Sequence, residues 1–303
     1  MEKGKSSITS LISAFGRAYH HQFDSPKIFD DFLAQELISQ EEFNDIKEKL
    51  IQGIQFFNPA IAEKFNGNPN EILKWITQIQ LSPTPLARAA YCEEVVLHEL
   101  EFGLKQVVLL GAGMDTFCLR HPELNHLEFF EVDHPATQAI KKKRLEQAGL
   151  TAPDNLHFVP MDFTKGFAVQ SLIHAGMVHK KTLFSLLGVS YYLTKEENAR
   201  LLENVFSKVP SGSSIVFDYA DETLFETKGL SNRVENMVKS AAACGEPMKS
   251  CFSYQEMEHL LEESGLLIYE QLSPNQINHR YFAHRSDYLS AFETIHYIHA
   301  VKE

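Results

Sequence analysis

The spacing of apolar positions changes near residue 103. From residue 8 to about 100 they recur every three or four residues, and β-branched runs are scarce, which predicts helices. Apolar stripes run through residues 28–37 and 43–57, and a further helix is expected from about Thr84 to Phe102. Asn58-Pro59 and residues 67–69 are typical of turns between helices. The first hundred residues therefore predict a helical region.

After Gly103, short apolar runs alternate with helical segments, a pattern that indicates βαβ units and a parallel sheet. The expected strands are 106–110, 127–132, 156–160, 182–187 and 214–219, followed by two β-rich segments at 266–272 and 292–301. Helices are expected near 134–148, 165–175, 195–209 and 253–263, with a polar helical segment at 221–250. The pattern predicts a Rossmann-like α/β sheet with helices on both faces.

Composition narrows the class of partner. A chain of 303 residues that is 44% hydrophobic can bury a sizeable core. Because 28 Lys and Arg stand against 40 Asp and Glu, nucleic acid or an anionic membrane is disfavoured as the main partner. The chain has neither a signal-like start nor a membrane-length apolar run, so we expect a cytoplasmic protein. The cysteines and histidines form no ligand-like cluster, so no metal is expected.

The candidate cofactor site begins where strand 106–110 runs into Gly111-Ala112-Gly113. Glycines permit a tight turn and let a ligand approach the backbone. By itself this pattern fits a purely structural turn about equally well. Thr116 stands where a dinucleotide-binding fingerprint has its third glycine, which disfavours NAD. A cofactor with a ribose but no phosphate, such as S-adenosylmethionine, suits this loop better.

Acidic residues follow the next two strands. Glu131 and Asp133 end the second strand, where a ribose needs acceptors; Asp133 is the first choice and Glu131 the second. Asp133 could also cap the next helix, with Pro135 near its start. The third strand leads to Asp162 and Phe163, whose carboxylate and backbone amide suit an adenine ring. A helix cap is again the alternative for Asp162.

Three further residues are candidates for the pocket. Arg88, on the helix expected at 84–102, could bind the cofactor's carboxylate through a bidentate fork, although an arginine on a helix is more often solvated. Tyr191 and Tyr192 follow the fourth strand, at the carboxyl ends of the strands where ligands bind in open α/β folds. Core or rim packing explains these tyrosines equally well.

Four segments together resemble the leucine carboxyl methyltransferase family, and the resemblance extends from about Arg17 to Val301. They are Leu86-Ala-Arg-Ala-Ala-Tyr91, Gly111-Ala-Gly-Met-Asp-Thr116, Phe130-Glu-Val-Asp133 and Gly188-Val-Ser-Tyr-Tyr-Leu-Thr194. The family includes methyltransferases of phosphatase C-terminal carboxyl groups and bacterial methyltransferases assigned to polyketide-type small molecules.

The resemblance implies a class I methyltransferase fold. Residues 1–102 would form an N-terminal helical lid, and residues 103–303 an S-adenosyl-L-methionine-binding domain with a cap insertion at 221–250. It places Arg88 at the methionine carboxylate, Gly111 with the Gly113 loop at the methionine backbone, Asp133 at the ribose, and Asp162 with Phe163 at the adenine.

The chain departs from the family pattern at two positions. Leu187 replaces a glutamate that precedes Gly188 in the family, which leaves open how the ammonium end of the cofactor is held at this position. Phe117 replaces an arginine that many members carry.

Methyl transfer from a sulfonium is an in-line displacement, and a carboxylate acceptor is already ionised at neutral pH and needs no base. No catalytic dyad is visible, and His134 and His279 lack an evident orienting partner. We therefore expect an O-methyltransferase that acts on a carboxylate, or a hydroxyl, of a small metabolite. The alternatives are methylation of a protein C-terminus and a non-catalytic S-adenosylmethionine-binding protein. The oligomeric state stays open.

Overall fold

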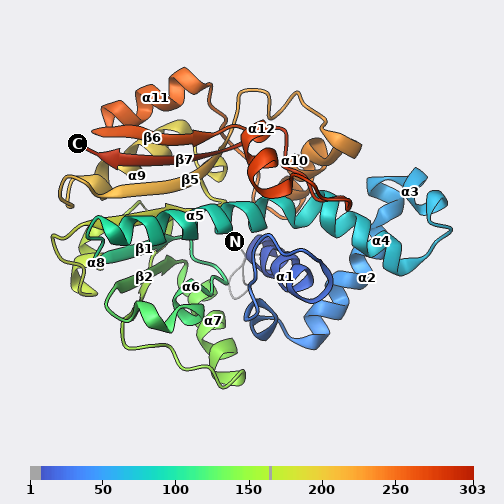
Figure 1. Ribbon diagram of the computed structural model, residues 1–303, viewed down its shortest axis with the longest axis horizontal. Coiled ribbons are helices and arrows are strands. Elements are labelled where there is room, and N and C mark those ends of the chain that lie inside the picture. Colours follow the sequence, from blue (N-terminus) through green and yellow to red (C-terminus); the bar gives the residue numbers. More distant parts are fainter. Residues whose placement is uncertain (1–7, 164–165) are drawn as a thin grey trace.

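The computed structural model describes residues 8–163 and 166–303, and its larger part is built around one seven-stranded sheet (Figure 1). Its strands are β1 (Gln106–Leu110), β2 (Glu128–Asp133), β3 (Leu156–Pro160), β4 (Thr182–Leu186), β5 (Ser214–Ala220), β6 (Leu266–Leu272) and β7 (Ile295–Lys302). Their order is β3-β2-β1-β4-β5-β7-β6. Strands β1 to β5 pair in parallel, and β7 runs antiparallel to β5 and β6. The predicted strands are confirmed to within a few residues.

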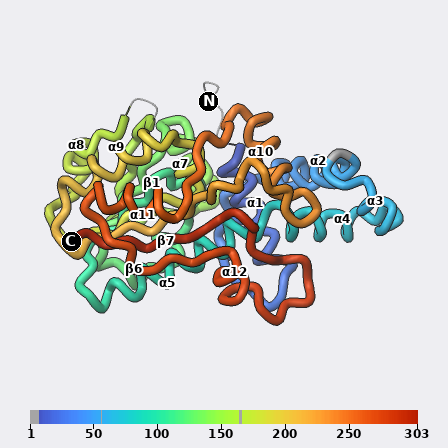
Figure 2. Tube along the Cα trace, turned by 90° about the horizontal axis from the view of Figure 1, so that it is seen from above, coloured from blue at the N-terminus to red at the C-terminus, as the bar shows by residue number. Residues whose placement is uncertain are grey.

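Helices cover both faces of the sheet, as predicted (Figure 2). Strands β1, β4 and β5 are buried at every position, which requires a covered sheet on either side. Helix α5 (Pro83–Glu101) contributes Leu86, Tyr91 and Val95 to the core of one face. The core of the other face contains residues of α8 (Val169–His174), α9 (Lys195–Phe206) and α11 (Tyr254–Glu263).

The N-terminal region forms the lobe on the right of Figure 1. It contains α1 (Ile8–Phe23), α2 (Gln40–Phe57), α3 (Pro59–Lys64) and α4 (Pro69–Ile76), and α4 continues into a π-helical stretch, Thr77–Leu81. The helices α1 and α2 share a small core with Met114 of the sheet domain and with Leu145 of α7 (Pro135–Gln147). The lobe therefore packs directly on the loop that follows β1.

The prediction of a continuous helix across residues 28–37 is wrong. Only a short 3-10 helix, Ala34–Leu37, forms there, and turns precede it. The side chain of Asp31, which precedes this 3-10 helix, accepts a hydrogen bond from the backbone N–H of its first residue, Ala34, at 3.0 Å. A side chain that bonds its own neighbouring backbone competes with helix formation.

Segment 221–250 is only partly helical, contrary to expectation. Helix α10 (Arg233–Ala243) occupies its centre, and a short 3-10 helix, Leu230–Asn232, turns and irregular segments make up the rest. Ser231 and Asn232 lie in the left-handed region at φ +53° and +60°, where a helix cannot continue. The segment still lies beside the N-terminal lobe, because Gln80 donates a hydrogen bond to the backbone oxygen of Arg233 at 3.0 Å.

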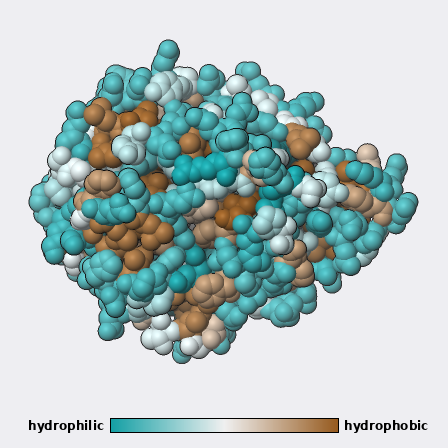
Figure 3. All heavy atoms as spheres, in the orientation of Figure 1, coloured by the Kyte–Doolittle hydropathy of each residue, from teal (hydrophilic) through white to brown (hydrophobic). Residues whose placement is uncertain are grey.

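Apolar and polar side chains are mixed on the face shown in Figure 3, with apolar atoms gathered over the sheet-bearing left part. Exposed apolar side chains on β6 and on or directly after α5 include Leu97, Phe102, Leu267 and Tyr269. No helix in the described part of the chain is long and apolar enough to cross a membrane.

Candidate cofactor and acceptor site

The strand order reverses between β1 and β4, and ligands of open α/β folds bind at such a point, beyond the carboxyl ends of the strands. Two loops meet there. Gly111, after β1, has φ +79°, and a Cβ on it would lie 2.7 Å from Cγ2 of Val189 in the loop after β4. Gly113 has φ +54°. The Gly111-x-Gly113 pattern therefore reflects a left-handed backbone and a close approach of the two loops.

Asp133, at the end of β2, binds the backbone of the glycine loop, Gly111-Ala112-Gly113. Its Oδ2 accepts a hydrogen bond from the N–H of Gly113 and its Oδ1 one from the N–H of His134, both at 2.6 Å. Burial raises the pKa of this carboxyl group, although the two backbone donors oppose the shift. A carboxylate offers about four lone-pair positions, so acceptor capacity is left for a ribose.

The alternative role of Asp133 as a helix cap is wrong. His134 is the N-cap of α7, and its Nδ1 accepts a hydrogen bond from the N–H of Ala136 at 3.2 Å. Pro135 occupies the first helical turn, as expected for a residue without an N–H.

Glu131, the second ribose candidate, already has a partner inside the fold. Its carboxylate is buried and lies 2.6 Å from Nζ of Lys141. Burial raises the pKa of Glu131 to about 7, and the attraction of Lys141 opposes this shift. The same Nζ donates to the backbone oxygen of Asp115 at 2.6 Å. Through Lys141, Glu131 thus supports the loop that contains Asp115. Asp133 remains the stronger candidate for the ribose.

Arg88 is not a solvated surface residue. Its Nη1 lies 3.1 Å from Oδ2 of Asp218 on β5 and donates to the hydroxyl of Tyr191, also at 3.1 Å. Burial disfavours the charge of the guanidinium, but the Asp218 carboxylate outweighs this effect and raises the pKa of Arg88. Among the described residues both side-chain bonds of Arg88 leave from Nη1, so Nε and Nη2 keep donors for a ligand.

Asp218 was missed by the sequence analysis. It is fully buried, and its Oδ1 accepts a hydrogen bond from the N–H of Gly188 at 2.5 Å. The signal that could have revealed it is a lone acid in the apolar run 214–220, because a buried carboxylate needs a partner. Leu187, where the family has a glutamate, is half-buried against the core. The carboxylate close to this position is that of Asp218 on β5, which accepts from the N–H of the next residue, Gly188.

The candidate pocket tyrosines lie in a 3-10 turn, Ser190–Tyr192. Tyr191 is buried beside Arg88, and its ring centre lies 4.9 Å from that of Tyr192. Burial is the main cause that raises the pKa of both side chains, to about 12 for Tyr192. Both hydroxyl groups are therefore neutral at physiological pH. Phe117, at the second departure from the family, is buried against Phe129.

The expected adenine residues lie on the other side of the glycine loop. Oδ2 of Asp162 is 4.0 Å from Nε2 of His134. Phe163 is partly buried against the core, with its ring centre 6.2 Å from that of Phe167. The alternative that Asp162 caps the following helix depends on residues 164–165 and lies outside the described residues. His279 is exposed on a π-helical turn, Asn278–Phe282, and within the described part of the chain no hydrogen bond or ion pair joins it to Asp162, Asp133 or Arg88.

These contacts define two groups at one edge of the sheet. Asp133 and the glycine loop form the first, with Asp162 next to them through His134; Arg88, Tyr191 and Asp218 form the second. A carboxylate with spare acceptors, a glycine loop and a guanidinium with spare donors fit a ligand with a ribose and a carboxylate. Within residues 8–163 and 166–303, no three His, Cys, Asp or Glu side chains are placed to hold a metal ion.

Comparison with known proteins identifies the family. The model described as "Leucine carboxyl methyltransferase" matches residues 10–206, well over half of the chain. This chain belongs to the leucine carboxyl methyltransferase family. It is 67% identical over 304 residues, covering the whole of both chains, to a Bacillus subtilis (strain 168) protein named "Putative S-adenosyl-L-methionine-dependent methyltransferase YktD". The resemblance found in the sequence is thereby confirmed.

Two other matches are more distant. A Mycolicibacterium gilvum (strain PYR-GCK) protein named "Putative S-adenosyl-L-methionine-dependent methyltransferase" is 35% identical over 133 residues, which are 44% of this chain and 54% of that protein. The magnesium protoporphyrin IX methyltransferase of Synechocystis PCC 6803, solved with bound SAH, aligns with a TM-score of 0.46 at 10% identity, over 73% of this chain and 86% of that one. The names of the two relatives agree with the predicted class and cofactor and specify no acceptor.

The guanidinium of Arg88 lies so close to Gly188 that a larger residue at this position is expected to destabilise the protein. A Cβ on Gly188 would lie 2.7 Å from Cζ of Arg88, and its φ of +71° already disfavours any other residue. Gly212 has a similar φ of +78° but open space around it. Gly188→Ala and Gly212→Ala should therefore share the left-handed penalty of about 1–2 kcal/mol.

Gly188→Ala should lose about 1–3 kcal/mol more of unfolding free energy, because the added methyl group displaces the guanidinium of Arg88 from its place beside Asp218. Urea denaturation of the two variants measures the difference. Equal losses of unfolding free energy in the two variants would show that the guanidinium of Arg88 can move away from residue 188 without a loss of stability.

Proposed function

We propose that this protein is an S-adenosylmethionine-dependent O-methyltransferase that methylates the carboxylate of a small, hydrophobic acid. The cofactor, when bound, supplies a methyl group on an electrophilic sulfonium. In this proposal Arg88 binds the methionine carboxylate, and Gly111 with Gly113 lies along the methionine backbone. Asp133 binds the ribose, Asp162 and Phe163 bind the adenine, and the Leu187 position lies near the ammonium end, with Asp218 as the neighbouring acid.

Among the described residues, none of the candidate histidines and tyrosines is placed to act as a general base, and this supports the choice of a carboxylate acceptor. Contrary to expectation, His134 is oriented: its Nδ1 accepts from the N–H of Ala136, so the proton of a neutral ring resides on Nε2, facing Asp162. His279 is exposed, and Tyr191 and Tyr192 are neutral. A phenol, with a pKa near 10, would need a base, whereas a carboxylate, with a pKa near 4, arrives ionised.

The N-terminal region and segment 221–250 meet above the glycine loop, which supports a small acceptor. A Cβ on Gly113 would lie 3.1 Å from Cβ of Ser10 in the first turn of α1. In the same turn, Oγ1 of Thr9 donates to Oε2 of Glu246 at 2.7 Å. We propose that the part of residues 1–102 that precedes α5 acts as lid and 221–250 as cap, and that together they exclude water from the reacting groups.

Turnover with purified protein tests the proposed function. Hydrophobic carboxylic acids, matched phenols and a peptide with a free C-terminus are offered separately with S-adenosylmethionine, and S-adenosylhomocysteine is quantified. We expect turnover with the acids, and a log kcat/KM that is flat between about pH 6 and 8, since an ionised carboxylate acceptor gives up no proton to the protein. His134→Gln should leave the profile flat.

Three results would contradict the proposal in different ways. A rate with phenols that climbs tenfold per pH unit and loses the climb in His134→Gln would indicate a base-assisted hydroxyl methyltransferase. Turnover of the peptide alone would indicate a protein C-terminus as acceptor. Tight binding of S-adenosylhomocysteine without turnover of any acceptor would indicate a non-catalytic binding protein.

A further inference from the structure

We call the loop after β1, residues 111–116, the cofactor loop. Each of its last four positions, 113–116, forms a hydrogen bond with a charged side chain from elsewhere in the fold. Two of these side chains belong to the sheet domain. The N–H of Gly113 donates to Oδ2 of Asp133 at 2.6 Å, and the backbone oxygen of Asp115 accepts from Nζ of Lys141 at 2.6 Å. These bonds anchor the loop to β2 and α7.

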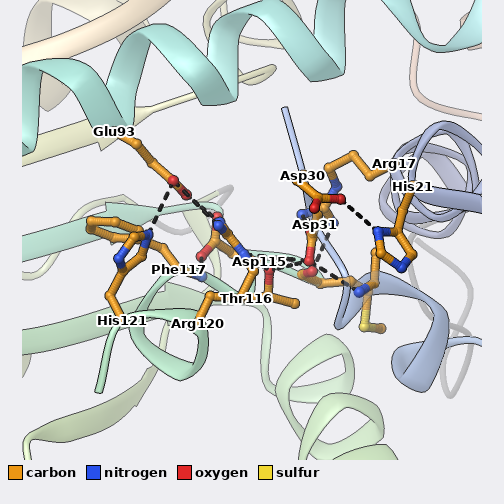
Figure 4. Close-up of polar contacts among 12 residues, drawn as sticks. Arg17, His21, Asp30, Asp31, Glu93, Asp115, Thr116, Phe117, Arg120 and His121 are labelled. Atoms are coloured by element: carbon orange, nitrogen blue, oxygen red, sulfur yellow. Dashed lines mark hydrogen bonds and ion pairs between the residues drawn. The ribbon is translucent and has the colours of Figure 1, made fainter. Parts of the chain in front are cut away.

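The other two side chains come from the N-terminal region (Figure 4). Nη2 of Arg17, on α1, donates to the backbone oxygen of Met114 at 2.7 Å, across 97 positions of sequence. Oγ1 of Thr116 donates to Oδ1 of Asp31 at 2.7 Å, across 85 positions. The lid region therefore holds the backbone and a side chain of the cofactor loop, in addition to covering it.

Arg17 and Asp31 also hold each other. Nη1 of Arg17 lies 2.6 Å from Oδ2 of Asp31, and the two residues are 6% and 0% exposed. Since both terminal nitrogens of Arg17 are engaged, one by Asp31 and one by Met114, the residue is suited to positioning the loop rather than to binding the cofactor's carboxylate.

The contacts continue from the loop to α5. Nε of Arg120 donates to Oγ1 of Thr116 at 2.9 Å and lies 3.4 Å from Oδ1 of Asp31. The far end of the Arg120 guanidinium binds the carboxylate of Glu93 on α5, as Figure 4 shows. Because α5 also carries Arg88, one largely buried network joins the lid region, the glycine loop and the helix whose Arg88 is proposed to bind the cofactor's carboxylate.

We propose that Arg17 and Asp31 are positioning residues of the cofactor site, which hold the oxygen of Met114 and the hydroxyl of Thr116 and thereby set the shape of loop 111–116. This inference rests on the proposed function, because it assigns to the lid region a part in binding S-adenosylmethionine. It follows that loosening the lid contacts lowers cofactor affinity and not only acceptor affinity.

Asp31→Asn in the full-length chain tests this, with Asp30→Asn as matched control. Asp30 is the adjacent acid, but its partner is His21 at 2.5 Å and its side chain is 52% exposed. Calorimetry measures the Kd for S-adenosylhomocysteine, and hydrogen exchange without ligand follows the amides of residues 113–116 and of β1. We expect Asp31→Asn to raise the Kd at least tenfold and to speed exchange in the loop but not in β1. Asp30→Asn should stay within twofold of the parent in both measurements.

Thr116→Val is the second variant, because it removes only the hydroxyl that Asp31 and Arg120 share, and it decides the matter if Asp31→Asn does not fold. A folded Asp31→Asn or Thr116→Val with an unchanged Kd and unchanged loop exchange would overturn the proposal. So would equal acceleration in the loop and in β1, which would show a general structural role. If the parent itself binds no S-adenosylhomocysteine, the proposed function fails, while the exchange measurement still decides whether the lid holds the loop.

Discussion

Replacing Arg88 with alanine is expected to lower both the stability of the protein and its affinity for S-adenosylmethionine. The change leaves the fully buried carboxylate of Asp218 without its cationic partner, and breaking a buried pair from one side costs about 3–5 kcal/mol of unfolding free energy. Loss of charged hydrogen bonds to the cofactor's carboxylate should weaken binding by about 1.5–3 kcal/mol. Denaturant titration and calorimetry measure the two effects.

A double variant separates them. Adding Asp218→Asn to Arg88→Ala removes the unpaired charge and should restore much of the stability, because an amide can still accept from the N–H of Gly188. The affinity for S-adenosylmethionine should stay low. Methylthioadenosine, which lacks the amino acid portion, should bind the parent and the double variant almost equally. Equal losses for the two ligands would contradict the carboxylate role of Arg88.

Asp133→Ala should weaken S-adenosylhomocysteine binding by about 1.5–3 kcal/mol, or roughly 10- to 150-fold, the range for charged hydrogen bonds. The carboxylate is the proposed ribose acceptor, and it also receives the N–H of Gly113. Asp133→Asn is the matched variant, since it keeps the size and one acceptor while it removes the charge, and a smaller loss is expected. Calorimetry gives both values.

Glu131→Gln is the control for position on the same strand. Its side chain is turned into the fold against Lys141, so the variant should change stability more than cofactor affinity. If Asp133→Ala is folded and binds S-adenosylhomocysteine as tightly as the parent, Asp133 does not contact the ribose. If Glu131→Gln shows the larger loss of affinity, the two acids exchange roles.

Local pattern predicted the sheet and most N-terminal helices, such as α2 and α5, but it failed at residues 28–37. Buried strands such as β1 and β4 are short apolar runs bounded by turn residues, and this signal is contained within a few neighbours. The stripe at 28–37 has helical spacing, yet Asp31 bonds the backbone of Ala34 and the side chains of Arg17 and Thr116. Partners that lie far along the chain override the local preference for helix.

The sequence by itself determined the glycine loop, the acid at the end of β2 and the family, because each depends on residue types at short spacing. Only the tertiary structure decided that Asp218 lies against Arg88, 130 positions earlier, and that Arg17 and Asp31 reach the loop after β1. It also decided that Glu131 pairs with Lys141 inside the fold while Asp133 holds the glycine loop. Charged groups that leave water must find partners, and which partner is within reach depends on how the strands, the helices and the N-terminal region pack together.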